Sequence, residues 1–341
     1  MRKFKILTLG AGAIGTYIGG SLALAGHQVA FVERPEVAKD LLARGLRLQL
    51  RSGEHLIPDP VVVGSLEEAL ATSEYDIAIF ALKSYHTSAF IDSLSTLHTP
   101  LPAILCLSNG VDNELALGAA LGRENIIAGT VTSAIGRNAA GDITLEKLRG
   151  LGIADEHPLA DELTQAMTDA GVNAQLFACA TDMKWSKMLT NLIANASAAV
   201  LDMTPAEIFA HPGIFALEMT QLREALHIMR AQGIHVVDLP GTPVRALAFA
   251  VRWLPMVISR PLLTKAVGSG RGGKMPSFHI DLHNGSGKSE VDYLNGAVVR
   301  AGKLLGIPTP VNALLTQSLL ALTRGEMPLD TYRHQPVKLF G

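Results

Sequence analysis

The stretch that decides the fold is FKILTLGAGAIG at residues 4–15, an apolar run that ends in the pattern G-x-G-x-x-G. The run at 4–9 predicts a β-strand, the Ala- and Leu-rich segment 13–25 predicts a helix, and QVAFV at 28–32 predicts a second strand. Glycine permits a tight turn at the first position, close approach of a pyrophosphate at the second, and close helix–strand packing at the third. This order of elements predicts a dinucleotide-binding unit. Its predicted cofactor-binding residues are Gly10, Ala11, Gly12, Ala13, Ile14 and Gly15.

The two residues after the second predicted strand bear on the choice of nicotinamide cofactor. An acidic residue there, Glu33, would bond the ribose 2′-hydroxyl and favour NAD. Arg34, which follows it, could pair with a 2′-phosphate and favour NADP. The two side chains point to different cofactors, and both would also suit a solvated loop. Residues 33 and 34 alone therefore leave the preference open.

The rest of the first half continues the pattern of alternating strands and helices. Apolar runs at 76–81 and 103–107 predict buried parallel strands, the run at 126–129 predicts a further strand, and the segments 86–97 and 113–121 can supply the intervening helices. The remaining predicted strands are a hairpin at 46–57, a few antiparallel strands within 131–153 and a last strand at 174–178.

From Asp182 onward, helical periodicity replaces the strand-like runs. The predicted helices are 182–200, 205–210, 213–232, 244–262, 288–305 and 311–324, and the glycine-rich segment 268–273 predicts a flexible linker. The sequence therefore predicts an α/β N-terminal Rossmann-type domain with a mostly parallel sheet, followed by an all-α C-terminal domain. The expected bounds are 1–180 for the first domain, 181–330 for the second and 331–341 for a tail.

Composition excludes several classes of protein. The chain has 341 residues, of which 48% are hydrophobic and 18% charged, so it can build large cores and is not a disordered chain. A net charge of −2 gives no attraction to nucleic acid, and no nucleic-acid partner is expected. Cys106 and Cys179 are too few for a disulfide framework or a multi-cysteine metal site. We expect both to be buried, in a chain that works in the reducing cytoplasm.

The stretch 245–263 is apolar enough to raise the question of a membrane. Arg245, Arg252 and Arg260 interrupt it, so it contains no uncharged span long enough to cross a bilayer. Arg245 and Arg252 would share one face of a helix, and Pro255 would interrupt that helix. We therefore expect a kinked amphipathic surface helix without membrane insertion, and a contact surface for a homodimer is one interpretation of it.

A polar stripe lies on an otherwise apolar predicted helix. Lys187, Asn191 and Asn195 are spaced i, i+4 and i+8, which places them on one face of an unbroken helix. Burying such polar groups without partners costs about 1–3 kcal/mol each, so the stripe needs partners. A bound polar ligand, a hydrogen-bond ladder to another helix or an exposed face would each account for it.

Other candidates carry weaker signals. Lys83 and Asn109 follow predicted strands, at the sheet edge where ligands of α/β folds bind. Glu290 opens a predicted helix, where an acidic residue is also favoured by the helix dipole. His279 and His283 are one helical turn apart, but no glutamate completes an HExxH arrangement, so no metal site is predicted.

Five blocks, taken in order along the chain, resemble the ketopantoate reductase (2-dehydropantoate 2-reductase) family. They are GAGAIG at 10–15, ALKSYHT at 81–87, SNGVDN at 108–113, KWSKMLTNLIAN at 184–195, and PSFHIDL at 276–282 with SEVDYLNGAVVRAGKLLGIPTPVN at 289–312. The family pattern of tryptophan, any residue, lysine and then asparagine four residues later is matched by Trp185, Lys187 and Asn191. The resemblance extends along nearly the whole chain.

The resemblance implies an NADPH-dependent reductase that converts a small-molecule 2-oxo acid, ketopantoate, to pantoate on the route to pantothenate. It implies that Lys187 is the catalytic lysine and that Glu290 lies beside it and the substrate. The other residues that it assigns are Asn191 and Asn195 for the substrate's polar groups, Ser277 for its carboxylate, Asp281 as a matching family aspartate, Asn109 on the nicotinamide and substrate side, and Lys83 with Arg34 for the 2′-phosphate.

Three departures from the family pattern concern the substrate. The segment between the predicted helix ending at 232 and Pro276 is longer and more apolar, residues 284–288 replace a short turn, and Phe278 stands where the family often has methionine. Two alternatives therefore stay open. One is reduction of a different 2-oxo or branched oxo acid on the same scaffold, and the other is a dinucleotide-binding sensor without turnover.

Overall fold

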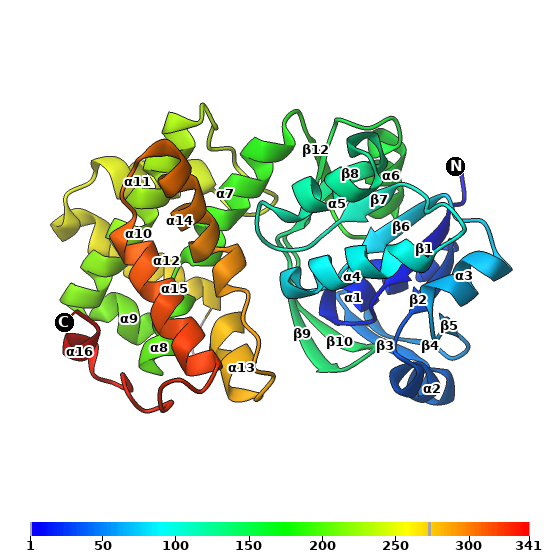
Figure 1. Cartoon of the computed structure of the whole chain (residues 1–341), viewed down its shortest axis with the longest axis horizontal. Coiled ribbons are helices and arrows are strands. Elements are labelled where there is room, and N and C mark those ends of the chain that lie inside the picture. Colours follow the sequence, from blue (N-terminus) through cyan, green and yellow to red (C-terminus); the bar gives the residue numbers. More distant parts are fainter. Residues whose placement is uncertain (1, 272–273, 341) are drawn as a thin grey trace. The chain divides into compact units, whose positions relative to one another are not determined.

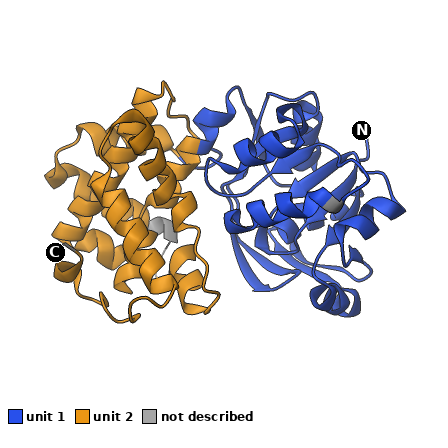
Figure 2. Ribbon diagram, viewed as in Figure 1, with its two compact units in different colours: residues 1–184, 239–242 blue, residues 185–238, 243–341 orange. Residues whose placement is uncertain are grey.

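The computed structural model describes residues 2–271 and 274–340, and the chain forms two compact units (Figures 1 and 2). Unit 1 holds the residues up to Lys184 together with Leu239–Thr242, and unit 2 holds Trp185–Asp238 and the chain from Pro243 onward. The chain therefore passes from one unit to the other three times. The first passage lies close to the domain boundary expected at residue 180, and the residues beyond 330 belong to unit 2.

An eight-stranded sheet forms the centre of unit 1, in the order β12-β11-β8-β7-β6-β1-β2-β5. Strands β8 and β11 pair antiparallel, and the other neighbouring strands run parallel. The strands are β1 Lys5–Leu9, β2 Gln28–Val32, β5 Val61–Val63, β6 Ile77–Phe80, β7 Ile104–Cys106, β8 Ile126–Val131, β11 Leu151–Ala154 and β12 Ala174–Phe177. The predicted Rossmann-type fold with a mostly parallel sheet is confirmed.

Helices cover both faces of this sheet, because successive strand residues point to opposite sides. Ile6 packs in one apolar cluster with residues of α1 and α6, and Leu7 packs in another with residues of α3, α4 and α5 (Figure 1). The helices of unit 1 are α1 Ala13–Leu24, α2 Pro35–Arg44, α3 Leu66–Thr72, α4 Thr87–Ser93, α5 Asn113–Leu121 and α6 Ala160–Asp169. This double covering explains why the strands read as continuous apolar runs.

A smaller four-stranded sheet, in the order β4-β3-β10-β9, also belongs to unit 1. The predicted hairpin at 46–57 is confirmed as β3 Leu46–Leu50 paired with β4 Gly53–Ile57. A second hairpin, β9 Ala134–Ala139 with β10 Asp142–Lys147, joins it through a parallel pairing of β10 with β3. Gly141, in the turn of the second hairpin, donates from its backbone N to Ala11 O at 2.9 Å, so this turn supports the glycine loop.

Unit 2 contains helices and turns but no strand within the residues that the structure describes. Its helices are α7 Ala180–Leu192, which begins in unit 1, then α8 Ala196–Leu201, α9 Pro205–Ala210, α10 Pro212–Ala231, α11 Val244–Trp253, α12 Met256–Arg271, α13 Ser277–His283, α14 Asn295–Leu305, α15 Pro310–Thr323 and α16 Pro336–Phe340. The predicted all-α second domain is confirmed.

Several predicted helix bounds are wrong. The helix predicted at 182–200 breaks after Leu192, and the one at 288–305 begins only at Asn295. The interruption predicted at Pro255 is confirmed, because α11 ends at Trp253 and α12 begins at Met256, and a proline ring clashes with a continuing helix. In the predicted linker 268–273, helix α12 continues to Arg271, and residues 272 and 273 lie outside the described part of the chain.

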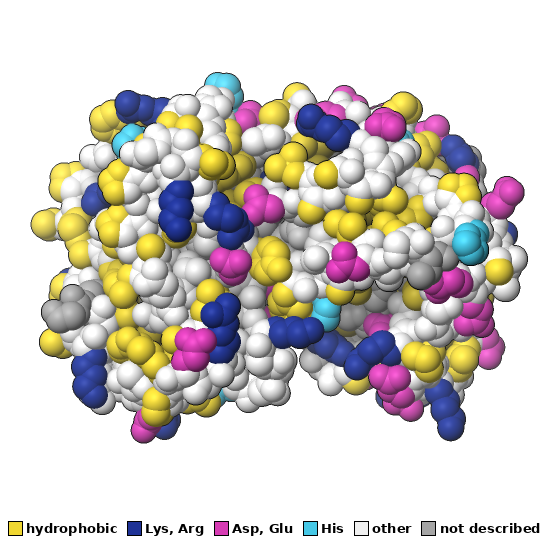
Figure 3. Space-filling view, in the orientation of Figure 1, with side chains coloured by type: hydrophobic (Ala, Val, Ile, Leu, Met, Phe, Trp, Pro, Cys, Tyr) yellow, Lys and Arg dark blue, Asp and Glu magenta, His cyan; other side chains and the backbone are white. Residues whose placement is uncertain are grey.

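The segment 245–263 leaves part of its apolar surface exposed. Helix α11 buries Val244 and Val251, whereas Phe249 is 58% and Trp253 72% exposed. Among the described residues, no helix is both long and apolar enough to cross a membrane. On the face of the molecule shown in Figure 3, basic, acidic and apolar side chains are interspersed, in keeping with the small net charge.

A buried polar network ties three helices of unit 2 together. Glu224 on α10 accepts at 2.9 Å from the backbone N of Val311 and of Asn312, at the start of α15. Asn312 Nδ2 also donates to Glu224 at 2.7 Å, and Asn295 Nδ2 on α14 donates to Asn312 Oδ1 at 3.0 Å. A carboxylate at the N-terminus of a helix complements the helix dipole. This network explains why polar side chains occur in the middle of apolar helices.

A four-residue segment from the second half of the chain, Leu239–Thr242, packs as part of unit 1. Leu239 and Thr242 pair with each other in an antiparallel bridge. Thr132 Oγ1, just after β8, donates to Pro240 O at 2.9 Å. A Cβ on Gly150 would lie 2.6 Å from the Cβ of Pro240, so the two chain segments are closely packed.

Candidate active site

The glycine loop has the geometry that its three glycines predict. Gly10 has φ +95°, a conformation that L side chains rarely adopt. A Cβ on Gly15 would lie 1.9 Å from Gly10 O, so only glycine lets helix α1 pack this closely on the loop. A Cβ on Gly12, in contrast, would meet no atom within 4 Å. The open space is therefore at the position where a pyrophosphate is expected to approach the backbone.

Helix α1 begins at Ala13, with Gly12 as its N-cap, and no side chain caps it. The first backbone N–H groups of a helix have no partner within the helix, and its dipole is positive at this end. Thr16 Oγ1 on α1 donates to Ala11 O at 2.9 Å, and this bond ties the glycine loop to the helix. The loop therefore fits the diphosphate of a dinucleotide, because it offers N–H donors and space for two phosphates.

The structure separates the two residues that follow β2. Glu33 Oε1 accepts from the backbone N of Ala11 at 2.6 Å, so its carboxylate lies against the glycine loop. Arg34 is 76% exposed and pairs with Glu36 at 3.4 Å. An acidic group held beside the loop is placed to accept a hydrogen bond from a ribose hydroxyl.

Two of the sequence blocks contact each other at the carboxyl ends of β6 and β7. Ser84 Oγ and Asn113 Nδ2 each donate to the backbone O of Asn109 at 2.6 Å. Thr87 Oγ1 in turn donates to Asn113 Oδ1 at 2.8 Å. The buried Asn113 thus fixes the loop that carries Asn109, while Lys83, which is half-buried, directly precedes Ser84.

Lys184 is a residue of this region that the sequence reasoning missed. Its side chain is 5% exposed, and its ammonium pairs with Glu114 at 2.6 Å and donates to Ser108 O at 2.7 Å. Because Ser108 directly precedes Asn109, Lys184 holds the loop at the end of β7. The signal that could have identified it is its place at the start of the block KWSKMLTNLIAN.

In unit 2, Lys187 and Asn191 lie on α7, one helical turn apart, and both are half-buried. The third member of the predicted stripe does not continue this face. Helix α7 ends at Leu192, and Ala194 has φ +46°, in the left-handed region. Asn195 then occupies the N-cap position of the next helix, α8, without a capping hydrogen bond from its side chain. The prediction that one unbroken helix presents three polar side chains on one face is therefore wrong.

A buried carboxylate from α10 holds the break between α7 and α8. Glu218, which is fully buried, accepts from Ala194 N at 2.7 Å and from Ser197 Oγ at 2.6 Å. Gln221, one turn later on α10, donates from Nε2 to Leu192 O at 3.2 Å. These bonds satisfy backbone groups that the broken helix would otherwise leave unpaired. The sequence signal was a polar residue at 218 and another at 221 on an apolar helix.

Both ends of the Asn195 carboxamide bind protein groups. Its Nδ2 donates to Asn191 O at 3.0 Å, and its Oδ1 accepts from the backbone N of Phe278 at 3.1 Å. The side chain is buried, and it joins the end of α7 to the start of α13. Hydrogen bonds to another helix, one of the explanations considered for the polar stripe, therefore account for the burial of Asn195 without a bound ligand.

The three remaining candidates of unit 2 lie on or near α13 and α14. Ser277 is the exposed first residue of α13, and Asp281 lies one turn later on the same helix, half-buried. Glu290 is 1% exposed. It precedes the 3₁₀ turn η4 Val291–Tyr293 rather than lying in the first turn of a long helix, so the interpretation as a dipole-stabilised surface acid is wrong.

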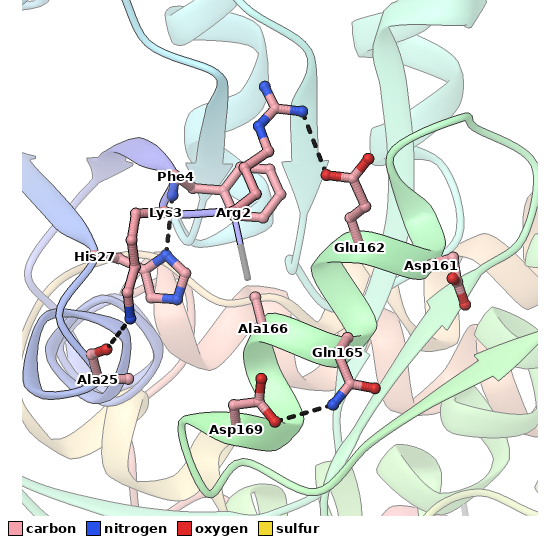
Figure 4. Close-up of a pocket in the computed structure, with 10 residues that line it drawn as sticks. All are labelled: Arg2, Lys3, Phe4, Ala25, His27, Asp161, Glu162, Gln165, Ala166 and Asp169. Atoms are coloured by element: carbon pink, nitrogen blue, oxygen red, sulfur yellow. Dashed lines mark hydrogen bonds and ion pairs between the residues drawn. The ribbon is translucent and has the colours of Figure 1, made fainter.

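Neither the two cysteines nor the cavity shown in Figure 4 is a better candidate for the active site. Burial raises the pKa of the Cys106 thiol, which makes it a poor nucleophile, and Cys179 is half-buried rather than buried as expected. The cavity, of about 520 Å³, is lined by Arg2, Lys3, Phe4, Ala25, His27, Asp161, Glu162, Gln165, Ala166 and Asp169 (Figure 4). It lies at the amino end of β1, whereas ligands of α/β sheets bind at the carboxyl ends.

Comparison with protein families gives two matches that together cover most of the chain. Residues 6–155 match the model of the family described as ketopantoate reductase PanE/ApbA. Residues 180–323 match the model of the C-terminal domain of ketopantoate reductase PanE/ApbA. The second match includes the α7–α8 break and α13.

Individual relatives are distant but extend over nearly the full length. The 2-dehydropantoate 2-reductase of Lactococcus lactis is 24% identical over 320 residues, covering 92% of this chain and 96% of that protein. A crystal structure of a PanE/ApbA family ketopantoate reductase from Ralstonia eutropha superposes with a TM-score of 0.79 at 25% identity, over 94% of this chain and 99% of that one. The ternary structure of D-mandelate dehydrogenase with NADH and anilino(oxo)acetate has a TM-score of 0.77 at 21% identity, over 94% and 98%.

Proposed function

The chain belongs to the ketopantoate reductase family, and from that premise we propose that it reduces the ketone of a 2-oxo acid with NADPH, with ketopantoate as the first candidate substrate. The product would then be pantoate, a precursor of pantothenate. The observation that carries the proposal is the placement of Lys187 and Asn191 one turn apart on α7, next to a break that Glu218 and Asn195 hold in place.

Lys187 is the proposed proton donor. Bound NADPH would supply the hydride, and negative charge would then develop on the ketone oxygen of the substrate. A lysine ammonium is protonated at neutral pH and can pass a proton to that oxygen, a role that contributes about 10²–10⁴-fold to such reactions. The Asn191 carboxamide can donate a hydrogen bond to the same oxygen without adding charge.

The other candidates of unit 2 have supporting roles in the proposal. Ser277, with an exposed hydroxyl at the start of α13, would bond the substrate carboxylate, and Asp281 would face the substrate from the same helix. Glu290 is the proposed partner of Lys187, since a carboxylate buried this deeply is stable when it is paired. Asn195 is proposed to position Asn191 and α13 rather than to bind the substrate, because both ends of its carboxamide are hydrogen-bonded to protein groups.

In unit 1 the proposal assigns the diphosphate to residues 10–15 and the nicotinamide side to Asn109. Arg34 and Lys83 would bind the 2′-phosphate of NADPH. The position of Glu33 favours NADH as a second candidate cofactor, because its carboxylate would accept from a ribose 2′-hydroxyl and repel a 2′-phosphate. The D-mandelate dehydrogenase neighbour was solved with NADH, which makes this alternative worth a direct test.

The substrate alternatives rest on the region around α13. Phe278 is buried in unit 2, so its ring supports the packing of the helix that carries Ser277. A 2-oxo acid with a different side chain from that of ketopantoate is therefore the second candidate substrate, and the anilino(oxo)acetate bound in the D-mandelate dehydrogenase structure makes aromatic 2-oxo acids the first to include.

One experiment distinguishes between the candidate cofactors, the candidate substrates and a sensor without turnover. The oxidation of NADPH and of NADH by the purified full chain is followed by absorbance with ketopantoate, aliphatic 2-oxo acids and aromatic 2-oxo acids. We expect the highest kcat/KM for ketopantoate with NADPH. Activity with other 2-oxo acids alone would assign a different substrate, and cofactor binding without turnover of any acid would replace the reductase with a sensor.

The exposed apolar residues of α11 and α12 are the proposed contact in a homodimer. Trp253 and its neighbour Val257 are 72% and 86% exposed. Light scattering on the wild-type chain is expected to give the mass of a dimer, and Trp253→Glu is expected to give that of a monomer. A wild-type chain that is monomeric at high concentration would reject this surface as a dimer contact.

A further inference from the structure

Two histidines and an aspartate lie together in unit 2. One potential ligand atom from each of Asp202, His279 and His283 lies within 4.8 Å of the other two. His279 Nε2 is 2.7 Å from Asp202 Oδ1. The rings of His279 and His283 stack with their centroids 4.0 Å apart.

The fold brings these residues together from two elements. His279 and His283 are four residues apart on α13, so they share one face of that helix. Asp202 ends α8 with φ +51° and ψ +46°, a left-handed conformation that aspartate tolerates better than most residues. Helices α8 and α13 pack together, which places a carboxylate opposite an imidazole that lies 77 residues later in the sequence.

The donor set is that of a transition-metal site. Imidazole nitrogen and carboxylate oxygen are ligands of Zn²⁺ and of neighbouring divalent metals, and two histidines with one carboxylate recur in zinc enzymes. The sequence predicted no metal here because the histidine segment itself supplies no suitable third ligand. The third ligand is instead Asp202, which only the fold reveals.

The groups around the cluster hold its ligands in place. Arg333 Nε lies 3.0 Å from Asp202 Oδ2, so it binds the carboxylate oxygen that His279 does not use. His283 Nδ1 lies 3.1 Å from His279 O, and a ring that donates from Nδ1 keeps its lone pair on Nε2. Hydrogen bonds of these kinds orient metal ligands in proteins and set the tautomer of ligating histidines.

We propose that Asp202, His279 and His283 bind one divalent transition-metal ion of the zinc class. The ion would take the place of the proton between His279 Nε2 and Asp202 Oδ1, and the ligating imidazole would carry its one remaining proton on Nδ1. Three protein ligands leave one tetrahedral position for water. This site is additional to the proposed reductase activity and does not depend on it.

Binding would tie the end of α8 to α13. The same two elements carry groups of the candidate active site, since Asn195 directly precedes α8 and accepts from the backbone N of Phe278 on α13. A metal ion at this point would therefore restrain the segment that positions Ser277. The expected consequence is an increase in thermal stability when the ion is bound, because it binds the folded chain alone.

The test is calorimetric titration of the untagged, chelator-treated full chain with ZnCl₂, together with visible absorption spectra after addition of CoCl₂. We expect about one ion per chain, a Co²⁺ spectrum typical of a four-coordinate site, and no uptake of Mg²⁺, which prefers oxygen ligands. His283→Gln should weaken Zn²⁺ binding by at least about 10-fold, since it removes one ligand of three.

The control variants keep the result interpretable. The side chain of His283 is exposed, so His283→Gln should fold normally, whereas Asp202→Asn could also disturb Arg333 and is used as a second variant. His227→Gln removes an exposed histidine of α10 and should bind zinc as the wild type does. The proposal is overturned if the wild-type chain binds no Zn²⁺, or if His283→Gln and His227→Gln bind it equally well.

Discussion

The glycine loop of unit 1 and the helix break of unit 2 both bend the chain at a candidate binding site, but they do so by different means. The loop relies on Gly10, which adopts φ +95° without a side chain, and all its essential residues lie within 10–15. The break relies on Ala194, a non-glycine residue at φ +46°, and on Glu218, which lies 24 residues later. The first bend is specified locally, and the second is specified by tertiary contacts.

The energetics of the two bends differ in the same way. A left-handed conformation costs a non-glycine residue about 1–2 kcal/mol, and glycine avoids most of that cost. At Ala194 the cost is offset by hydrogen bonds to a buried carboxylate, each worth about 1.5–3 kcal/mol. A bend held in this way depends on side chains from another helix, Glu218 above all, so it should be more sensitive to distant substitutions.

The largest expected effect concerns the helix that ends at this break. Lys187→Ala should lower kcat by at least about 100-fold, because the variant loses the proposed proton donor, and the change in melting temperature should be small, because the Lys187 side chain is only half-buried. Steady-state kinetics and thermal unfolding measure the two quantities. Near-normal turnover would remove Lys187 from the mechanism.

Lys184, three residues earlier on the same helix, is the matched control. Lys184→Met leaves the carboxylate of Glu114 and the backbone O of Ser108 without their donor. Breaking a buried ion pair typically costs about 3–5 kcal/mol of stability. We therefore expect a marked loss of melting temperature from this variant, the reverse of the pattern for Lys187→Ala.

Glu218→Ala tests whether the break depends on one distant carboxylate. It leaves the backbone N of Ala194 and the hydroxyl of Ser197 buried without an acceptor, at about 1–3 kcal/mol each. We expect a lower melting temperature and a fall in kcat that exceeds any change in cofactor Kd. Glu218→Gln, which keeps one acceptor oxygen, should recover part of both. Unchanged stability in Glu218→Ala would contradict the assignment of Glu218 to the break.

The glycine loop offers a pair of substitutions that separates packing from ligand approach. Gly15→Ala places a Cβ 1.9 Å from Gly10 O and should destabilise unit 1 by about 1–3 kcal/mol, the usual cost of overpacking. Gly12→Ala meets no protein atom within 4 Å, so the fold should tolerate it while cofactor binding weakens. Equal stability losses for the two variants would show that the loop is not divided into a packing position and a ligand position.

The residues after β2 give a smaller effect on cofactor preference. Arg34→Ala should weaken NADPH about 10-fold more than NADH, since a charge-assisted hydrogen bond contributes about 1.5–3 kcal/mol. Glu33→Gln should shift the preference toward NADPH by removing a negative charge. Dissociation constants for both cofactors measure the shifts, and equal weakening of both cofactors in Arg34→Ala would show that Arg34 does not bind the 2′-phosphate.

The smallest expected effect lies in unit 1, far along β1 from the glycine loop. Burial and the nearby Lys3 ammonium lower the pKa of His27, whose Nδ1 accepts from Phe4 N at 3.1 Å (Figure 4). As the pH falls below about 6.5, the unfolded chain takes up a proton at this residue before the folded chain does, so stability decreases. Thermal unfolding between about pH 7.5 and 5.5 should show a smaller decrease for His27→Gln than for the wild type. An equal decrease in both chains would assign the acid sensitivity to other groups.

The features predicted correctly from the sequence are those that neighbouring residues determine. The glycine loop, the hairpin at 46–57 and the apolar strands of the sheet follow from turn chemistry and periodicity. Ser65 caps α3 by accepting from the backbone N of Glu68, three residues later, at 3.1 Å, which is another contact between near neighbours in the sequence. Each of these signals is contained within about a dozen residues of sequence.

The features that sequence reasoning missed depend on partners far along the chain. The apolar periodicity continues through residues 193–195, and nothing local marks the break that Glu218 stabilises. The role of Asn195 depends on the backbone of Phe278, and the third member of the histidine cluster is Asp202. Helix propensities hold no information about a hydrogen-bond partner on another helix, because that partner comes close only when the chain has folded.

The short segment Leu239–Thr242 limits how unit 1 can be isolated from the rest of the chain. Because these four residues belong to unit 1 while the chain on either side belongs to unit 2, cutting the chain once after Lys184 leaves part of unit 1 on the other fragment. A fragment ending there would lack Pro240 O, the acceptor of Thr132 Oγ1. A recombinant version of the first unit alone would need this tetrapeptide grafted back, and protease digestion would liberate the unit only after two further cleavages.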